Sequence, residues 1–247
     1  MSVYNLISQY ILIIGSIVAL VFLAVAGNEK RAAAGLTRQN WKSAVLIVLA
    51  FVGIYIVRTV VSVAVQGVSD GSGMQYVKEW AAMFKNPMMW LNIAALPINY
   101  FFVFIAFFGE EYGWRYYLQP VLQKRFGLRA GVIILGVVWG LWHIPDDLFY
   151  YTQTSGIQMI FAQQITCISL GIFFAYAYMK TQNIWVPVCL HYLNNNLIPI
   201  ISGTFSADVL ENQTVSWKDL PVALVLNGLC FGFFLLADAV SYTHLRA

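Results

Sequence analysis

The fold is constrained most by seven apolar segments, each long enough to be a membrane-spanning helix: 4–27, 43–67, 88–119, 130–150, 157–179, 184–203 and 221–240. A helix needs about 20 apolar residues to cross the hydrocarbon core of a bilayer. Only 10% of the 247 residues are charged, whereas soluble domains carry about 25%. We therefore expect an all-α, polytopic membrane protein. One membrane domain, 1–247, would have about seven transmembrane helices that enclose a polar site.

Two of these segments need a closer reading. Segment 88–119 is too long for one straight span, so we expect a kink at Pro97 or a helix that runs beyond the bilayer. The first segment contains Ala24-Val25-Ala26, which is similar to a signal-peptide cleavage site. No basic residue precedes this segment, and Lys30 and Arg31 follow it. We therefore predict a retained membrane helix.

The distribution of Lys and Arg predicts the orientation in the membrane. Three of these residues lie in the even-numbered loops: Lys78, Lys85 and Lys218. Nine lie in the odd-numbered loops and the tail: Lys30, Arg31, Arg38, Lys42, Lys124, Arg125, Arg129, Lys180 and Arg246. Basic residues gather on the cytoplasmic side, so we place the odd loops there and the N-terminus outside.

Several charged residues and the cysteines are expected to have structural roles only. Segment 76–90 has apolar residues at helical spacing between charged ones, which predicts an amphipathic helix at the outer interface. Arg58 is expected to extend its charge towards the membrane surface or to form a structural pair. We expect three reduced cysteines, Cys167, Cys189 and Cys230. We also expect solvated loop residues at Asp146 and Asp147, and no membrane role for 241–247.

A cluster of charges inside an apolar segment points to a functional site, because ionisable groups are costly in lipid. Glu110, Glu111 and Arg115 lie near the end of the third segment. Glu111 and Arg115 are four residues apart and can pair on one helix face, whereas Glu110 is rotated about 100° away. This predicts a structural Glu111 and leaves Glu110 available as a base. The alternative is that all three are solvated at the helix end.

Two further segments place polar side chains in apolar runs. Trp139 and His143 share one face of the fourth segment, and His191 and Asn195 share one face of the sixth. Asparagines flank Asn195 on both sides, so spacing alone selects it. Either pair, taken alone, could instead be hydrogen-bonded packing between helices.

Two glycine pairs accompany these motifs. Gly109 and Gly113 bracket the glutamates, and Gly136 and Gly140 precede His143. Glycines four residues apart let helix backbones approach closely. We expect these pairs to bring the unpaired glutamate and His143 within reach of one water molecule.

Together, the three motifs resemble the signature of the CPBP family, the CAAX-protease and bacteriocin-processing (Abi) group of intramembrane peptidases. That signature is Glu-Glu-x-x-x-Arg, then aromatic-x-x-x-His, then His-x-x-x-Asn/Asp, on successive helices. Residues 110–115, 139–143 and 191–195 match its parts in order, with Trp139 where phenylalanine is commoner. The resemblance covers roughly 88–203, which would be the catalytic core.

The resemblance implies a role for each matched residue. Glu110 and His143 would activate the attacking water. His191 and Asn195 would donate hydrogen bonds to the oxyanion that develops on the substrate, a preorganised electrostatic effect. The implied activity is hydrolysis of a peptide bond in a membrane-associated protein or peptide. A prenylated protein tail and a bacteriocin precursor are both compatible substrates.

The supporting residues and the metal requirement follow from the same resemblance. Glu111 and Arg115 would hold the helix and tune the site. The family is often labelled metalloprotease, and Glu110, His143 and His191 are chemically able to hold a divalent metal such as zinc. No HExxH motif is present. A metal-bound water and a carboxylate-activated water both stay open.

Two other classes of protein fit parts of the pattern. A non-catalytic membrane scaffold, or a bacteriocin self-immunity protein of the same fold, would keep the helices without the reaction. A transporter would use the buried charges as an ion path, but it predicts inverted repeats, and the sequence has no internal symmetry. The net charge of +3 is not a nucleic-acid signal. The expected partners are the lipid bilayer and a membrane-associated substrate.

Overall fold

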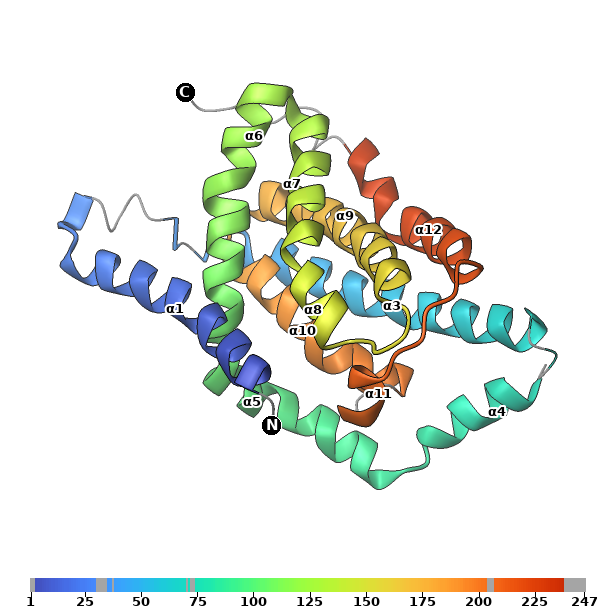
Figure 1. Ribbon diagram of the computed structural model, residues 1–247. Helices are drawn as coiled ribbons and strands as arrows, with labels where there is room; N and C mark the ends of the chain where they lie inside the picture. The colour runs from blue at the N-terminus through green and yellow to red at the C-terminus, as the bar shows by residue number, and fades with distance from the viewer. Residues whose placement is uncertain are drawn as a thin grey trace.

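The computed structural model describes residues 3–29, 35–36, 38–69, 71, 74–203 and 207–237. In this part of the chain every regular element is a helix, which confirms the all-α prediction (Figure 1). The elements, in chain order, are α1 Val3–Val25, α3 Trp41–Ser69, α4 Met74–Met83, α5 Pro87–Glu111, the π-helix η1 Tyr112–Leu118, α6 Gln119–Phe126, α7 Leu128–Trp142, α8 Ile144–Phe149, α9 Gly156–Thr181, α10 Trp185–Ser202, α11 Ala207–Glu211, α12 Asp219–Cys230 and the 3₁₀-helix η2 Gly232–Leu236.

The chain is an integral membrane protein. Among the described residues, 4 helical stretches are long and apolar enough to cross a bilayer: Trp41–Val68, Pro87–Phe126, Leu128–Phe149 and Gly156–Thr181. Two shorter apolar stretches are Ile13–Val25 and Asp219–Cys230. Each of the predicted apolar segments holds a helix, but the count of seven spans is not confirmed.

The outer surface of the helices is apolar, as lipid contact requires. Leu46 is 67% exposed, Ile98 67% and Phe101 72%. Large exposed apolar surfaces are rare on soluble monomers and mark contact with lipid or with another protein. The interior is held instead by packed aromatic rings. Phe51 stacks on Phe173 with ring centroids 5.5 Å apart.

The longest helical stretch, Pro87–Phe126, has 40 residues. At 1.5 Å per residue it is about 60 Å long, roughly twice the hydrocarbon thickness of a bilayer. This agrees with the expectation of a helix that runs beyond one span. Pro97 lies inside α5, and the chain turns between the start of α5 and α6 (Figure 1). The π-helical turn η1 follows directly after Glu111 and carries Arg115.

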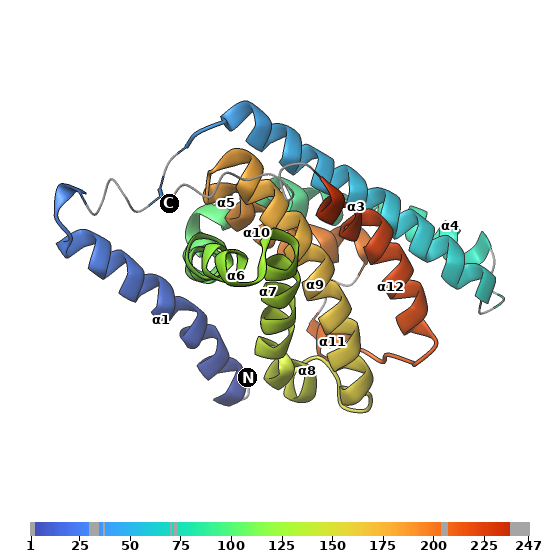
Figure 2. The same cartoon turned by 90° about the horizontal axis from the view of Figure 1, so that it is seen from above.

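Three of the four glycines permit close packing, but between different helices from those predicted, whereas nothing lies within 4 Å of a Cβ at Gly113. A Cβ at Gly136 would lie 2.7 Å from the Cα of Ile168 in α9, and one at Gly140 would meet the Gln164 side chain at 2.6 Å. A Cβ at Gly109 would meet Ser16 of α1. The close approaches at these glycines are therefore not between α5 and α7. The glycines of α7 instead seat it on α9, and these two helices lie side by side in Figure 2.

The structural interpretations of several isolated residues can now be compared with the structure. Segment 76–90 divides between α4 and the start of α5, with a turn between them. Arg58 forms a structural pair, because its Nε donates to Asn227 Oδ1 at 2.7 Å. The 3 cysteines are free thiols. Lys30, Arg31 and 241–247 lie outside the described residues.

Candidate active site

The Glu111 carboxylate is the centre of a buried ion cluster. Its side chain is fully buried, and its Oε2 lies 3.1 Å from Nε of Arg115. This is the pair that the four-residue spacing predicted. Its Oε1 lies 2.9 Å from Nδ1 of His191, which comes from α10. Glu111 therefore ties the first motif to the third, and the sequence spacing gave no indication of this contact.

Arg115 is held in an aromatic enclosure. The guanidinium carbon lies 5.2 Å from the ring centroid of Trp139 and 5.5 Å from that of Phe174. A cation over an aromatic face is attracted by the ring quadrupole, and the attraction is stronger in a desolvated site. The side chain is fully buried. Arg115 therefore fixes the Glu111 carboxylate from a position that is itself fixed by α7 and α9.

Trp139 orients the two histidines of the site. Its backbone carbonyl oxygen lies 2.8 Å from Nδ1 of His143, one turn later at the end of α7. Its indole ring contacts His143 and His191, with centroids 5.7 Å and 5.4 Å away. A carbonyl oxygen can only accept, so Nδ1 of His143 carries the hydrogen in this contact. In the neutral ring, Nε2 is then the nitrogen with a free lone pair.

The asparagines of α10 have separate surroundings. The Tyr55 hydroxyl donates to Asn194 Oδ1 at 2.5 Å. Asn194 Nδ2 in turn donates to Asn195 Oδ1 at 2.8 Å. Asn196 turns elsewhere, and its Nδ2 donates to the Tyr192 carbonyl at 2.9 Å. Asn194 and Asn195 are therefore connected to α3 through Tyr55, whereas Asn196 donates within its own helix.

A cavity of about 320 Å³ gathers residues of the second and third motifs. Its walls include His143 at the end of α7, His191 and Asn195 from α10, and Cys167 from α9. The other polar residues that line it are Tyr150, Tyr151, Gln163, Thr166, Asn194 and Gln213. Three of the four predicted catalytic residues therefore line one cavity.

Glu110, the fourth predicted catalytic residue, lies beside this cavity but is not among the residues that line it. Its Oε2 accepts a long hydrogen bond of 3.5 Å from Nε1 of Trp114. The carboxylate is close enough to interact electrostatically with Arg115, Cys167 and His191. Within the part of the chain that the structure describes, no hydrogen bond joins Glu110 to His143.

Comparison with known proteins agrees with the geometry. Residues 91–197 match the family described as Type II CAAX prenyl endopeptidase Rce1-like. This range contains all three motifs that supply the ion cluster and the cavity. A curated relative, CAAX prenyl protease 2 of Methanococcus maripaludis, is 27% identical over 125 residues, which are 47% of this chain and 45% of the relative. Both matches support membership of the CPBP family.

The chain spans about half the length of this curated relative. The family match leaves α1 and α3 outside the shared region, although Tyr55 of α3 donates to Asn194, which lines the cavity. No solved structure matches the chain.

The predicted metal ligands do not assemble into a zinc site. Among the described residues, no group of three or more His, Cys, Asp or Glu side chains could hold a metal ion. Nδ1 of His143 faces a backbone carbonyl, and Nδ1 of His191 faces Glu111. As arranged, the Glu110, His143 and His191 side chains do not converge on one point.

Some residues in and around the site were missed or misread from the sequence. Asp147 was expected in a solvated loop, but it lies in α8 and is fully buried. Tyr151 lines the cavity, and burial raises its pKa, so its phenol stays protonated at neutral pH. Tyr55 has no motif around it. A signal for Asn194 was present, because three consecutive asparagines in an apolar helix imply a polar surface on more than one side.

Proposed function

We propose that this protein is an intramembrane endopeptidase that hydrolyses a peptide bond of a membrane-associated protein with an activated water molecule. The observation that carries this proposal is the single cavity lined by His143, His191 and Asn195. A base and two polar groups that can donate to an oxyanion are the minimum set for hydrolysis of an amide. The family match supports the same class of reaction.

His143 is the base in this mechanism. Its Nδ1–H donates to the Trp139 carbonyl, which leaves Nε2 to accept a proton from water. The water oxygen then attacks the carbonyl carbon of the scissile bond. The imidazolium that forms returns its proton to the leaving amine nitrogen as the C–N bond breaks. Cys167 Sγ lies 3.8 Å from Nδ1 of His143 and packs against the ring.

His191 and Asn195 stabilise the oxyanion. A carboxylate on Nδ1 favours the protonated imidazole, whose Nε2–H can then donate to the substrate oxygen. Asn195 accepts through Oδ1 from Asn194, so its own amide hydrogens remain available to donate. A preorganised donor of this kind is worth roughly 10²–10³ in kcat.

Glu110 balances the charge of the site and supports the base. Glu110 and Glu111 carry two negative charges, which Arg115 and protonated His191 offset. A cluster with no net charge is far less costly in a low-dielectric environment than an unbalanced one. Glu110 approaches the attacking water when substrate enters, because catalytic hydrogen bonds often tighten only in the loaded enzyme.

The proposed substrate class is a prenylated protein or peptide tail at the membrane surface. The name of the Methanococcus relative supports this class, since it is a CAAX prenyl protease. The Lys and Arg asymmetry supports an N-terminus outside the cell, with the odd loops in the cytoplasm.

A cleavage assay in reconstituted vesicles tests the proposal. The purified chain is incubated with a fluorescent farnesylated peptide that ends in a CAAX sequence, and with the same peptide without the prenyl group. We expect the prenylated peptide to be cleaved, and cleavage to be lost in Glu110→Ala, His143→Ala and His191→Ala. Tyr117→Phe is the matched control, because this tyrosine side chain is 69% exposed.

The outcome decides between the enzyme and a scaffold of the same fold. If wild type and all three variants fold but none cleaves either peptide, this substrate class is wrong. A search for uncleaved membrane peptides in cells that express each variant then tests the reaction itself. If no peptide accumulates in any variant while binding to the prenylated peptide persists, the protein is a non-catalytic scaffold.

A further inference from the structure

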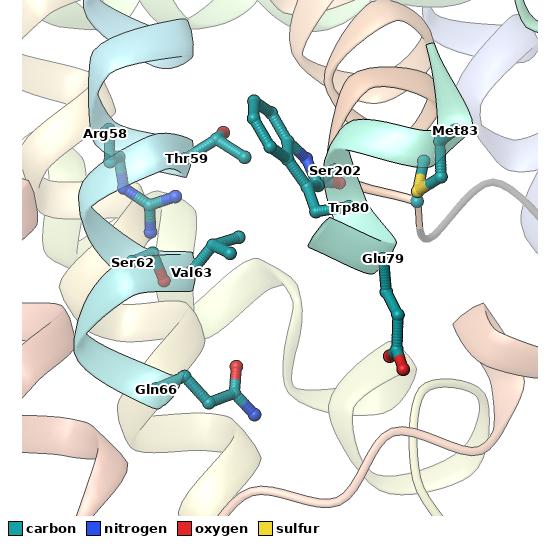
Figure 3. Close-up of a pocket in the computed structure, with 10 residues that line it drawn as sticks. Arg58, Thr59, Ser62, Val63, Gln66, Glu79, Trp80, Met83 and Ser202 are labelled. Carbon is teal, nitrogen blue, oxygen red and sulfur yellow. The ribbon is translucent and has the colours of Figure 1, made fainter. Parts of the chain in front are cut away.

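A second cavity, of about 540 Å³, lies between α3, α4 and the end of α10 (Figure 3). Its polar lining residues include Arg58, Thr59, Ser62 and Gln66 from α3 and Glu79 from α4. It shares no lining residue with the cavity that holds His143 and His191. The catalytic mechanism uses none of these side chains.

The α3 wall offers a cation and hydroxyls on one helix face. Arg58 and Ser62 are four residues apart, and Thr59 lies three residues before Ser62. Arg58 is held from behind, because its Nε donates to the buried Asn227 and its guanidinium lies 5.7 Å from the Tyr55 ring centroid. This leaves its two terminal nitrogens to bind a ligand.

The hydroxyl of Thr59 is available to a ligand. The residue is only 5% exposed and lines the cavity. Across the described residues, no hydrogen bond is formed by the side chain of Thr59 or of Ser62. Both hydroxyls can therefore donate to a ligand oxygen in the cavity.

The opposite wall carries the opposite charge. Glu79 lines the cavity from α4, and its Oε1 accepts from Gln75 at 2.6 Å. Next to it, Trp80 Nε1 donates to the Ile201 carbonyl at 2.9 Å and fixes α4 against α10. Within the described chain, no ion pair joins Glu79 to Arg58. A ligand that carries both charges would satisfy both walls.

The cavity lies in a part of the chain that is expected at the membrane surface. The cavity lies beside the last part of the span Trp41–Val68 and beside α4, a 10-residue helix with mixed apolar and charged residues. Short helices of this kind lie in the headgroup region of a bilayer, and Trp is enriched there.

We propose that this cavity binds a zwitterionic amino-phosphate group. The phosphate oxygens accept from Arg58, Thr59 and Ser62, and the ammonium group donates to Glu79. This group occurs as the headgroup of phosphatidylethanolamine and as free phosphoethanolamine. Arginine matches phosphate geometry because its guanidinium presents a rigid fork of donors. The site takes no part in peptide hydrolysis, so this proposal is tested independently of the proposed function.

Binding to the purified full chain in detergent micelles tests the proposal. Native mass spectrometry counts bound phosphatidylethanolamine and phosphatidylglycerol, which share the phosphate but differ in the ammonium group. We expect phosphatidylethanolamine to bind about tenfold more tightly, as one charge-assisted hydrogen bond implies. Displacement by free phosphoethanolamine would assign the site to the soluble group, and retention of the lipid would assign it to the headgroup in the membrane.

Three variants make the test specific. Glu79→Gln should remove the preference between the two lipids. Ser62→Leu fills the cavity without altering the Arg58–Asn227 pair, and it should weaken both lipids about tenfold. Lys78→Gln also changes one charge of α4, but this residue is exposed and does not line the cavity, so it should bind as wild type does.

Equal binding of the two lipids by wild type would overturn the proposal. The same holds if Ser62→Leu keeps wild-type affinity. Thermal unfolding of each variant shows that lost binding is not lost folding.

Discussion

Glu111 Oε1 lies 2.9 Å from Nδ1 of His191, and this contact joins two helices whose residues are 80 positions apart in the sequence. The same carboxylate holds Arg115 through its other oxygen. Glu111 therefore has two tasks, since it fixes the long helix and also orients one proposed oxyanion donor. Loss of its charge should affect folding and catalysis together.

Glu111→Gln tests this double role. The substitution keeps the size of the side chain but leaves Arg115 as a buried cation without a counter-charge. Breaking a buried ion pair from one side costs about 3–5 kcal/mol. We expect a lower thermal midpoint in micelles and loss of peptide cleavage. Glu29→Gln is the control, because that carboxylate is exposed. An unchanged midpoint in Glu111→Gln would show that the pair contributes little to stability.

Tyr55→Phe tests the connection from α3 to the asparagines. The substitution removes only the hydroxyl that donates to Asn194, so Asn195 loses the support of its neighbour. We expect kcat to fall about tenfold with KM unchanged, and stability to fall by about 1 kcal/mol. Tyr117→Phe removes an exposed hydroxyl and should change neither quantity. A rise in KM with constant kcat would instead place Tyr55 in substrate binding.

Trp139→Phe tests which part of the indole matters. The carbonyl that orients His143 belongs to the backbone and stays. Within the described residues, Nε1 of Trp139 has no hydrogen-bond partner, so its loss removes no bond. We expect cleavage within about threefold of wild type, with a small cavity cost of about 1 kcal/mol. Trp139→Ala should lose activity, because Arg115 and both histidines lose their contact with the indole ring. Equal damage from both variants would mean that the N–H itself is needed.

The sequence predicted what depends on spacing within one helix. The Glu111–Arg115 pair, the shared face of Trp139 and His143, and the helical character of each apolar segment all follow from 3.6 residues per turn. Contacts between distant helices could not be predicted in this way. The Glu111–His191 bond and the Tyr55–Asn194 bond depend on how helices cross, which no local pattern fixes. The glycine pairs indicated close packing correctly, but they did not identify its partner.

Gly136→Ala tests the packing of α7 on α9. The new methyl group would lie 2.7 Å from the Cα of Ile168, which is backbone and cannot turn aside. Overpacking of this kind costs about 1–3 kcal/mol. Gly53→Ala is the matched substitution in α3, where nothing lies within 4 Å of the new methyl. It should stabilise the protein by up to about 1 kcal/mol, since alanine is the better helix former. Thermal unfolding in micelles should therefore give shifts of opposite sign.

Asn195→Ala and Asn196→Ala separate catalysis from packing within one motif. Asn195 is exposed to the cavity, so its loss should leave the thermal midpoint nearly unchanged and lower kcat by roughly 10²–10³. Asn196 donates to the Tyr192 carbonyl and also accepts from Asn99 at 3.4 Å. Its loss should destabilise the helix packing by about 1 kcal/mol and leave kcat close to wild type. Steady-state cleavage and unfolding of the two variants, measured side by side, check both parts. If Asn196→Ala abolishes cleavage and Asn195→Ala does not, the oxyanion donor was assigned to the wrong asparagine.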